Sequence, residues 1–252
     1  MAEVFSRHLV IVRHGESEGD VRRAHRDNGI KYRSDKLPQD EEQTELGSEQ
    51  SIAAGKWIAK YVLEAYGFRS FDVCATSPMI RTKQSAASLG LSRSWIEDSL
   101  LTERKRGKIQ GLTRAGHESL YPGSYEQMNK YPFHWVPPGG ESMLEVVDRT
   151  TRFTEQIKDN KSVLVETHRD WIWAVQIPLE GISLNEALAI DTDKIQNGQI
   201  LHYTNVDPQD GTVAGQPFCW KRSVCPWDTE EQVVETSMHW ISLASTLDEI
   251  PV

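Results

Sequence analysis

A short segment near the start of the chain places an arginine, a histidine and a glycine directly after an apolar run. Residues 9–12 read Leu-Val-Ile-Val, which is typical of a buried strand, and Arg13, His14 and Gly15 follow. Open α/β sheets bind ligands beyond the carboxyl ends of their strands, so a cation and an imidazole here would face a ligand. Gly15 would let the backbone turn tightly and let the ligand come close. These residue types suit the binding of a phosphoryl group and nucleophilic attack on it.

Residues 13–17, Arg-His-Gly-Glu-Ser, resemble the Arg-His-Gly signature of the histidine phosphatase superfamily, which includes the cofactor-dependent phosphoglycerate mutases. The resemblance runs from about residue 9 to about residue 203 and rests on the preceding strand and on the order of the later motifs. It implies that His14 forms a phosphohistidine, an intermediate that divides one difficult displacement into two easier ones. The alternative is a histidine that only hydrogen-bonds the backbone at a strand end.

Two further site residues come from later motifs of the same resemblance. Residues 75–86, which contain Arg81, resemble the family's second motif, in which Arg and Gln-(Thr/Ser)-Ala recur on one helix. Arg13 and Arg81 would then contact the phosphoryl oxygens, because guanidinium groups present forked donors that fit phosphate. His168 ends a third apolar run and matches the family's second histidine, which donates a hydrogen bond to the phosphoryl group. We expect bound phosphate to favour its protonated form. A solvated arginine and a buried structural histidine are the alternatives.

Glu103 is the expected proton donor. Residues 101–111 resemble the family's acid loop, in which a glutamate is followed by a glycine four residues later. Cleavage of an ester requires a proton on the departing alkoxide, and the same carboxylate can then take a proton from water. A dianionic substrate nearby would favour the neutral acid. The alternative is a surface glutamate paired with the neighbouring arginines.

Asp20 departs from the family's pattern, because many members have an asparagine there that helps to hold the phosphoryl group. A carboxylate cannot donate a hydrogen bond, and it repels phosphate unless it is protonated or paired. We therefore expect Asp20 to turn away or to pair with Arg22 or Arg23. Asp20 and Ser17 of the signature are both candidates for substrate contact.

Two further departures add positive charge to the expected site. Arg169 stands after His168, where the family usually has glycine, and an arginine there would strain a backbone that needs a positive φ. Arg104 begins the basic run 104–106 in the acid loop, which is either a solvated surface or a substrate contact. With Arg104 and Arg169 as candidate substrate contacts, this charge suggests a substrate with more than one phosphate or carboxylate.

Apolar runs and capping signals indicate the elements that position these residues. Buried strands are expected near residues 9–12, 71–76, 162–167 and 200–203, with a weaker one at 217–220. Helices are expected after Thr44, from Ser77-Pro78 to Gly90, from Ser142 and Glu145 to about Lys158, and from 169 to a stop or kink at Pro178. This alternation predicts an α/β three-layer sandwich, with a mostly parallel central sheet covered by helices on both faces. We expect one domain over residues 1–252, with a lid-like loop at about 18–43 and an insertion at about 91–135.

Composition narrows the classes of function. The 252 residues are 38% hydrophobic, with 28 Lys and Arg against 37 Asp and Glu, for a net charge of −9. Such an acidic chain is a poor candidate for nucleic-acid binding, and its apolar runs are too short to span a membrane. Residues 1–7 lack a secretory core, and three cysteines are too few for a disulfide framework, so we expect a cytoplasmic protein with reduced thiols. No metal-ligand spacing is present, so no metal or cofactor is expected.

The sequence therefore predicts a metal-independent phosphomonoester hydrolase whose partner is a small anionic phosphate ester. Asp20 and Arg169 motivate one alternative, a catalytically weak protein that binds phosphoesters or other partners. A phosphoglycerate mutase is a weaker alternative, because the acid loop and the insertion do not look close to those of the mutases. Neither the identity of the substrate nor the oligomeric state can be read from these residues.

Overall fold

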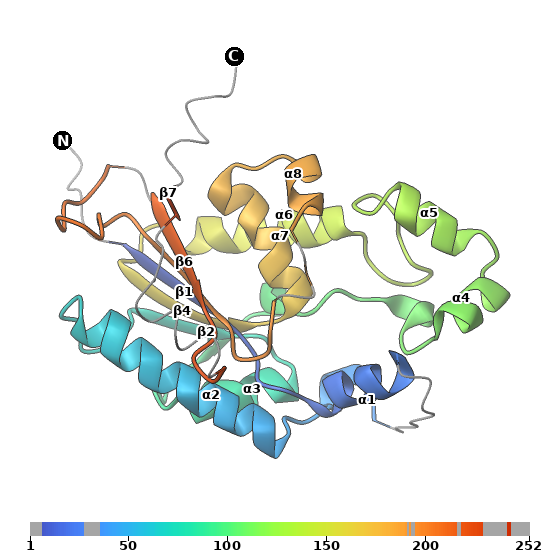
Figure 1. Ribbon diagram of the computed structural model, residues 1–252, viewed down its shortest axis with the longest axis horizontal. Helices are drawn as coiled ribbons and strands as arrows, with labels where there is room; N and C mark the ends of the chain where they lie inside the picture. Colours follow the sequence, from blue (N-terminus) through green and yellow to red (C-terminus); the bar gives the residue numbers. More distant parts are fainter. Residues whose placement is uncertain are drawn as a thin grey trace, which may run out of the picture.

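The computed structural model describes residues 7–27, 36–190, 192, 195–215, 218–228 and 241–242. In this part of the chain, seven strands form one sheet in the order β3-β2-β4-β1-β5-β6-β7, with helices on both of its faces (Figure 1). The strands are β1 (His8–Arg13), β2 (Val73–Thr76), β3 (Ile96–Glu97), β4 (Ser162–Thr167), β5 (Ile200–Thr204), β6 (Trp220–Val224) and β7 (Ile241–Ser242). The predicted α/β three-layer architecture is confirmed.

The sheet is parallel on one side of β1 and antiparallel on the other. Strands β3, β2, β4 and β1 run in the same direction, whereas β5 is antiparallel to β1, β6 to β5, and β7 to β6. In the register of β1 and β4, Arg13 lies opposite Thr167, so both strands end at the same edge. His14 and His168 therefore follow neighbouring strand ends although they are far apart in the sequence. This edge is where an open α/β sheet presents a ligand site.

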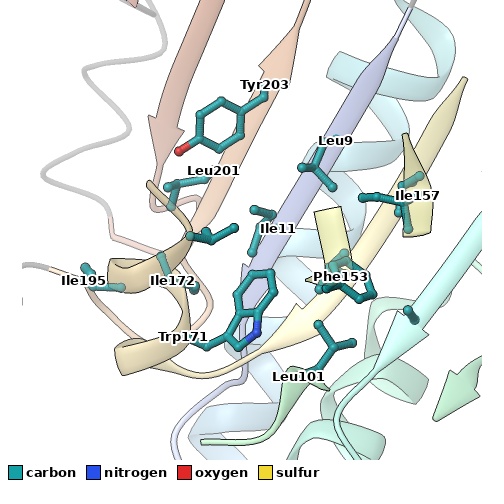
Figure 2. Packing of buried hydrophobic residues seen from close by; sticks show 14 residues of the cluster. Leu9, Ile11, Leu101, Phe153, Ile157, Trp171, Ile172, Ile195, Leu201 and Tyr203 are labelled. Atoms are coloured by element: carbon teal, nitrogen blue, oxygen red, sulfur yellow. The ribbon is translucent and has the colours of Figure 1, made fainter. Parts of the chain in front are cut away.

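The core lies on both faces of β1, whose side chains alternate between two clusters. Leu9 and Ile11 point toward α6 (Met143–Ile157) and α7 (Arg169–Glu180), where they pack with Phe153 and Trp171 (Figure 2). Val10 and Val12 point to the opposite face, toward α2 (Glu45–Ile58) and α3 (Ile80–Leu89). Each fully buried side chain of this size contributes roughly 1.5–3 kcal/mol. Burial on both faces explains why β1 is an unbroken apolar run.

The capping signals located most of the helix boundaries. Thr44 caps α2 by accepting a hydrogen bond from Gly47 N, and Ser142 with Glu145 forms a capping box at the start of α6. Gly90 ends α3 with a φ of 69°. Ser77, however, does not cap α3, which begins at Ile80.

Two expectations about the later helices also need correction or completion. Helix α7 continues through Pro178 and ends at Glu180, where Gly181 takes a left-handed conformation. Arg169 is the first residue of α7, and among the described residues only glycines have a positive φ, so Arg169 carries no such strain. Two further segments of helix are η2 (Ala59–Glu64), a π-helical continuation of α2, and α8 (Leu184–Leu188).

The segment 18–43 is not the continuous loop that its polar composition suggested. Residues 18–27 form the helix α1 (Glu18–Asp27), with acidic residues in its first turn and basic residues in its last, which suits the helix dipole. The short helix η1 (Pro38–Asp40) follows, and residues 28–35 lie outside the described residues. The only apolar side chains of α1 are those of Val21 and Ala24, so its polar composition was interpreted as a loop.

The segment 91–135 contains short elements rather than a single irregular loop. After β3 come η3 (Ser99–Leu101), η4 (Gly107–Ile109), α4 (Arg114–Leu120) and α5 (Ser124–Lys130). Figure 1 shows α4 and α5 projecting away from the sheet on the side where α1 also lies. Within the described part of the chain, every helix is too short or too polar to cross a membrane.

Candidate active site

His14 lies in a tight connection between β1 and α1. Gly15 is required here, because a Cβ on it would lie 2.0 Å from the carbonyl oxygen of Gly47 in α2. Gly47 is constrained in the same way, since its Cβ would lie 2.1 Å from the oxygen of Glu16. The close approach that Gly15 permits is therefore to the backbone of α2, and this packing fixes the position of the neighbouring imidazole.

The hydrogen bonds of His14 define which ring nitrogen is available for attack. Nδ1 lies 2.7 Å from the carbonyl oxygen of Gly15, which can only accept, so Nδ1 carries the proton. Nε2 accepts a hydrogen bond of 3.2 Å from Nε of Arg81 and therefore carries the lone pair. Burial is the main cause that lowers the pKa of His14 to about 3, and the charges of Arg81 and Arg13 add to it. At neutral pH the ring is a neutral nucleophile whose Nε2 faces a guanidinium group.

Arg81 links the two histidines of the site. Its Nη2 lies 3.2 Å from Nδ1 of His168, and its Nη1 donates to the carbonyl oxygen of Pro38 at 2.6 Å. The ring centroids of His14 and His168 are 5.1 Å apart. Both rings and this guanidinium thus converge on one small region beyond β1, β2 and β4.

His168 is neutral in this arrangement. Burial, followed by the charge of Arg81, lowers the pKa of His168 well below its ordinary value. Because Arg81 donates to Nδ1, Nε2 holds the ring proton and contacts the hydroxyl oxygen of Ser77 at 2.9 Å. The protonated form expected from the sequence would need the added negative charge of a phosphate.

Asp20 is paired, as the sequence allowed, but its principal partner is Arg13. Nη2 of Arg13 donates to Oδ1 of Asp20 at 2.8 Å, whereas Arg23 lies 3.7 Å from the same oxygen and Arg22 contacts Glu41 instead. Burial alone would raise the pKa of Asp20, but its neighbours, Arg13 and Arg23 among them, hold it well below its ordinary value. Arg13 and Asp20 thus form a buried ion pair beside His14.

The Arg13–Asp20 pair is part of a network that holds the signature segment. The other oxygen of Asp20 accepts hydrogen bonds from the backbone and hydroxyl of Ser17 at 3.0 and 2.6 Å, and it lies 3.9 Å from Nδ1 of His14. Nη1 of Arg13 donates to the carbonyl oxygen of Ile195 at 2.6 Å. In this geometry Arg13 and Ser17 direct these hydrogen bonds to the protein itself.

Glu103 and His14 both line one cavity of the protein. Burial, reinforced by the negative charge of Asp170, raises the pKa of Glu103, while its Oε1 accepts a hydrogen bond from Arg104 N at 2.9 Å. Burial would also raise the pKa of Asp170, but Arg106, at 2.7 Å, together with Arg169 lowers that pKa to about 2. The pKa values of the two carboxyl groups therefore differ, so that Asp170 is ionised and the acid form of Glu103 is favoured.

The basic residues of the acid loop and of α7 have different positions. Nε and Nη2 of Arg104 donate hydrogen bonds to the carbonyl oxygens of Glu141 and Trp135 at 3.0 and 3.3 Å, which link the acid loop to the segment 135–141. Arg104 also lines the cavity that contains His14. Arg169 lines a second, neighbouring cavity and is not among the residues around His14. The structure therefore separates two arginines that the sequence placed in one site.

The cavity over His14 has a volume of about 550 Å³. Its walls include His14, Ser17, Asp20, Arg81, Glu103 and Arg104. Sequence reasoning missed Glu41, which also lines it with Oε2 3.8 Å from Nη1 of Arg81, as well as the partners Ser77 and Asp170. Ser77 follows the end of β2, and Asp170 lies two residues after His168, so their positions near strand ends could have indicated both. Glu41 lies in an acidic run that gives no such signal.

Among the described residues, no group of three or more His, Cys, Asp or Glu side chains is placed to hold a metal.

Comparison with protein families gives the class to which this fold and site belong. The model of the histidine phosphatase superfamily (branch 1) matches residues 9–209. The chain therefore belongs to the histidine phosphatase superfamily.

Its curated relatives include enzymes named 2,3-bisphosphoglycerate-dependent phosphoglycerate mutase. The protein from Methylobacterium sp. (strain 4-46) is 29% identical over 185 residues, which cover 69% of this chain and 81% of the relative. The protein from Chelativorans sp. (strain BNC1) is 28% identical over 221 residues, which cover 82% and 96%. These relatives match this chain over most of their length.

Solved structures of phosphatases share the fold. A mycobacterial glucosyl-3-phosphoglycerate phosphatase with inorganic phosphate has a TM-score of 0.58 and 22% identity, covering 78% of this chain and 89% of that one. A putative α-ribazole-5'-P phosphatase from Escherichia coli str. K-12 substr. MG1655 has a TM-score of 0.60 and 17% identity, covering 84% of this chain and 95% of that one. At these identities the likeness concerns the fold alone.

Proposed function

We propose that this protein is a phosphomonoester hydrolase that acts on a small anionic phosphate ester through a phosphohistidine on His14, without a metal ion. The observation that supports this most strongly is the tautomer of His14, which leaves the Nε2 lone pair beside Arg81 in a cavity that Glu103, a carboxyl group with a raised pKa, also lines. A nucleophile, a cation for the phosphoryl oxygens and an acid are thereby held around one space.

In the first step, Nε2 of His14 attacks phosphorus and forms an N–P bond while the bond from phosphorus to the ester oxygen breaks. The proton of Glu103 moves to the departing oxygen, which leaves as an alcohol. Arg81 moves its hydrogen bonds from the imidazole to the phosphoryl oxygens, which gain charge in the transition state. Nδ1 keeps its proton against Gly15, so the phosphorylated ring is cationic and remains a good leaving group.

In the second step, a water molecule attacks the phosphorus atom of the phosphohistidine. Glu103, now ionised, takes one proton from this water, and the N–P bond breaks. The products are inorganic phosphate, neutral His14 and protonated Glu103, which is the state in which the cycle began. The raised pKa of Glu103 supports both of its roles, because it eases the return of the proton.

A mutase is the second candidate, because the curated relatives at 28–29% identity carry that name. A mutase must return the phosphoryl group to another hydroxyl of the bound molecule rather than to water. The alternative of a catalytically weak protein loses its support from Asp20, since Arg13 neutralises that carboxylate.

Release of inorganic phosphate from butyl phosphate and from p-nitrophenyl phosphate tests the proposal. Turnover is expected with and without a chelator, with loss in His14→Ala and little change in His134→Ala, which removes an exposed histidine outside the cavity. Turnover that survives in His14→Ala, or that a chelator abolishes, contradicts the proposed mechanism. A phosphoglycerate whose phosphate changes position without release of inorganic phosphate would identify a mutase instead.

A further inference from the structure

A second cavity of about 490 Å³ lies beside the one that contains His14. The two cavities share a wall, because the same five residues line both. These shared residues are Arg23, Arg26, Arg106, Gln110 and Gly111. The two cavities are therefore adjacent.

The second cavity, which we call the arginine pocket, concentrates positive charge from four separate segments. Five arginines line it: Arg23 and Arg26 of α1, Arg106 of the acid loop, Arg114 of α4 and Arg169 of α7. Among its described lining residues there is no aspartate or glutamate. The chain as a whole carries a net charge of −9, so a group of five arginines is not what its overall composition would lead one to expect.

The local contacts of the arginine pocket hold its cations in place. Arg106 pairs with Asp170 at 2.7 Å, and Nε of Arg169 lies 3.7 Å from the other oxygen of the same carboxylate. The guanidinium carbon of Arg114 lies 4.4 Å from the centre of the Tyr125 ring, so the ring supports it from one side. The carboxylate of Asp170 thus contacts two of the five arginines that line the pocket.

We propose that the arginine pocket binds a second phosphate group of the substrate, so that the preferred substrates are esters that carry two or more phosphates. This inference rests on the proposed function of the first cavity. Guanidinium groups bind phosphate oxygens through paired charge-assisted hydrogen bonds, and a phosphate carries more charge than a carboxylate for several cations to share. The shared wall lets one ligand place one phosphate at His14 and another among these arginines.

The test measures binding with phosphonates, whose carbon–phosphorus bonds resist hydrolysis, so that it does not depend on turnover. Calorimetry on the full chain compares butylphosphonate with propane-, butane- and hexane-bisphosphonates that carry one phosphonate at each end. At least one bisphosphonate is expected to bind at least about tenfold more tightly than butylphosphonate, as paired charge-assisted hydrogen bonds allow. The double variant Arg114→Gln/Arg169→Gln, which changes two residues of the arginine pocket alone, is expected to reduce that ratio to about twofold or less.

A double variant with the same loss of charge serves as the matched control. Lys108→Gln/Lys130→Gln removes two exposed lysines from the same region that line neither cavity, and it should preserve the affinity ratio. Equal affinity for all the phosphonates, or a preference that both double variants reduce equally, overturns the proposal. If 5-phosphonopentanoic acid binds as tightly as the best bisphosphonate, the pocket holds any anion and its assignment to phosphate is wrong.

Hydrolysis assays separate this inference from the proposed function. If the bisphosphonate preference holds while His14-dependent phosphate release is absent, the arginine pocket stands and the hydrolase proposal fails. If simple monophosphates are hydrolysed through His14 but bisphosphonates gain no affinity, the hydrolase proposal stands and the arginine pocket is rejected.

Discussion

Nε of Arg81 donates a hydrogen bond of 3.2 Å to Nε2 of His14, the nitrogen that is proposed to attack phosphorus. The same guanidinium contacts His168 through Nη2, so a phosphoryl group that enters must take over hydrogen bonds that the protein already makes. Burial and the two remaining contacts of Nη1, with the carbonyl oxygen of Pro38 and with Glu41, keep the arginine in place during that exchange. Arg81 is thus positioned for the oxygens of the transition state before substrate arrives.

Replacement of Arg81 should therefore affect catalysis more than folding. In Arg81→Gln we expect kcat/KM for an alkyl phosphate to fall by about 10²–10³-fold, the usual cost of removing one preorganised donor. Arg81→Lys should recover only part of the loss, because an ammonium group cannot contact both histidines at once. Steady-state kinetics with Arg93→Gln, an exposed arginine outside the cavity, provide the control. Equal activity of Arg81→Gln and Arg93→Gln would refute this role.

Glu103→Gln should slow the release of poor leaving groups selectively. Butoxide needs a proton as it departs, whereas p-nitrophenolate leaves readily without one. We expect the rate of phosphohistidine formation from butyl phosphate to fall by about 10²–10⁴-fold, the usual contribution of a general acid, and that from p-nitrophenyl phosphate to fall much less. Rapid-quench measurement of the first turnover isolates this step. An equal loss for both esters is incompatible with a proton donor at residue 103.

Asp170→Asn should shift the pH dependence of the same step. The negative charge of Asp170 helps to raise the pKa of Glu103, so its removal should lower that pKa. Glu103 donates its proton only below its pKa, and the alkaline limb of the kcat/KM profile should therefore move to lower pH. The profile for p-nitrophenyl phosphate, which needs the acid less, serves as the internal comparison. A limb that stays in place or moves upward would show that Asp170 does not act on Glu103.

Much of this arrangement could be predicted from the sequence because strand ends and capping residues leave local signals. The apolar run of β1, its glycine turn and the capping box of α6 each depend on neighbouring residues, and the sequence located them. His14 and His168 were expected together because parallel strands end at one edge. Helix α1 was missed because it is almost entirely polar, and a polar segment without a capping signal was interpreted as a loop.

Partners that come from distant segments could not be predicted in the same way. Arg106 is bound by Asp170, 64 positions away, and composition cannot select such a pair among the many charges of this chain. The position of Arg169 beside α1 and α4 depends on how the segment 91–135 folds over α7. The division of the basic residues between two cavities is therefore a property of the tertiary structure alone.

The Arg13–Asp20 pair should contribute to stability as well as to the geometry of His14. Removal of one partner leaves a buried charge uncompensated, so Asp20→Asn should lower the free energy of unfolding by about 3 kcal/mol at pH 7. The neighbouring charges lower the pKa of Asp20, so its contribution is present above its ordinary pKa of 3.8 and is lost as the pH falls further. Urea denaturation of both proteins between pH 7 and pH 3 measures this. A difference between them that grows toward low pH contradicts the assignment.

Glu166 of β4 should produce the opposite pH dependence. Burial raises its pKa well above the ordinary value of 4.5, so the folded protein keeps a proton that the unfolded chain loses. The stabilisation that protonated Glu166 contributes is therefore fully present below pH 4.5, the pKa of this group in the unfolded chain. It is lost as the pH rises toward the folded pKa, by at most about 1.4 kcal/mol per pH unit. Glu166→Gln should remove this decline and be the more stable protein at pH 8, as measured by urea denaturation. A variant less stable than the parent at every pH would show that the carboxyl group is ionised in the fold.

Phosphorus NMR of the trapped phosphoenzyme tests the central claim most directly. Protein from the first turnover, quenched and denatured in alkali and then digested at alkaline pH, should yield one phosphorylated peptide that contains His14, with phosphorus bonded to Nε2, because Nδ1 is held by Gly15. The same treatment of His14→Ala should yield none. Phosphate on Nδ1, on another residue, or on no residue during active turnover would contradict the account.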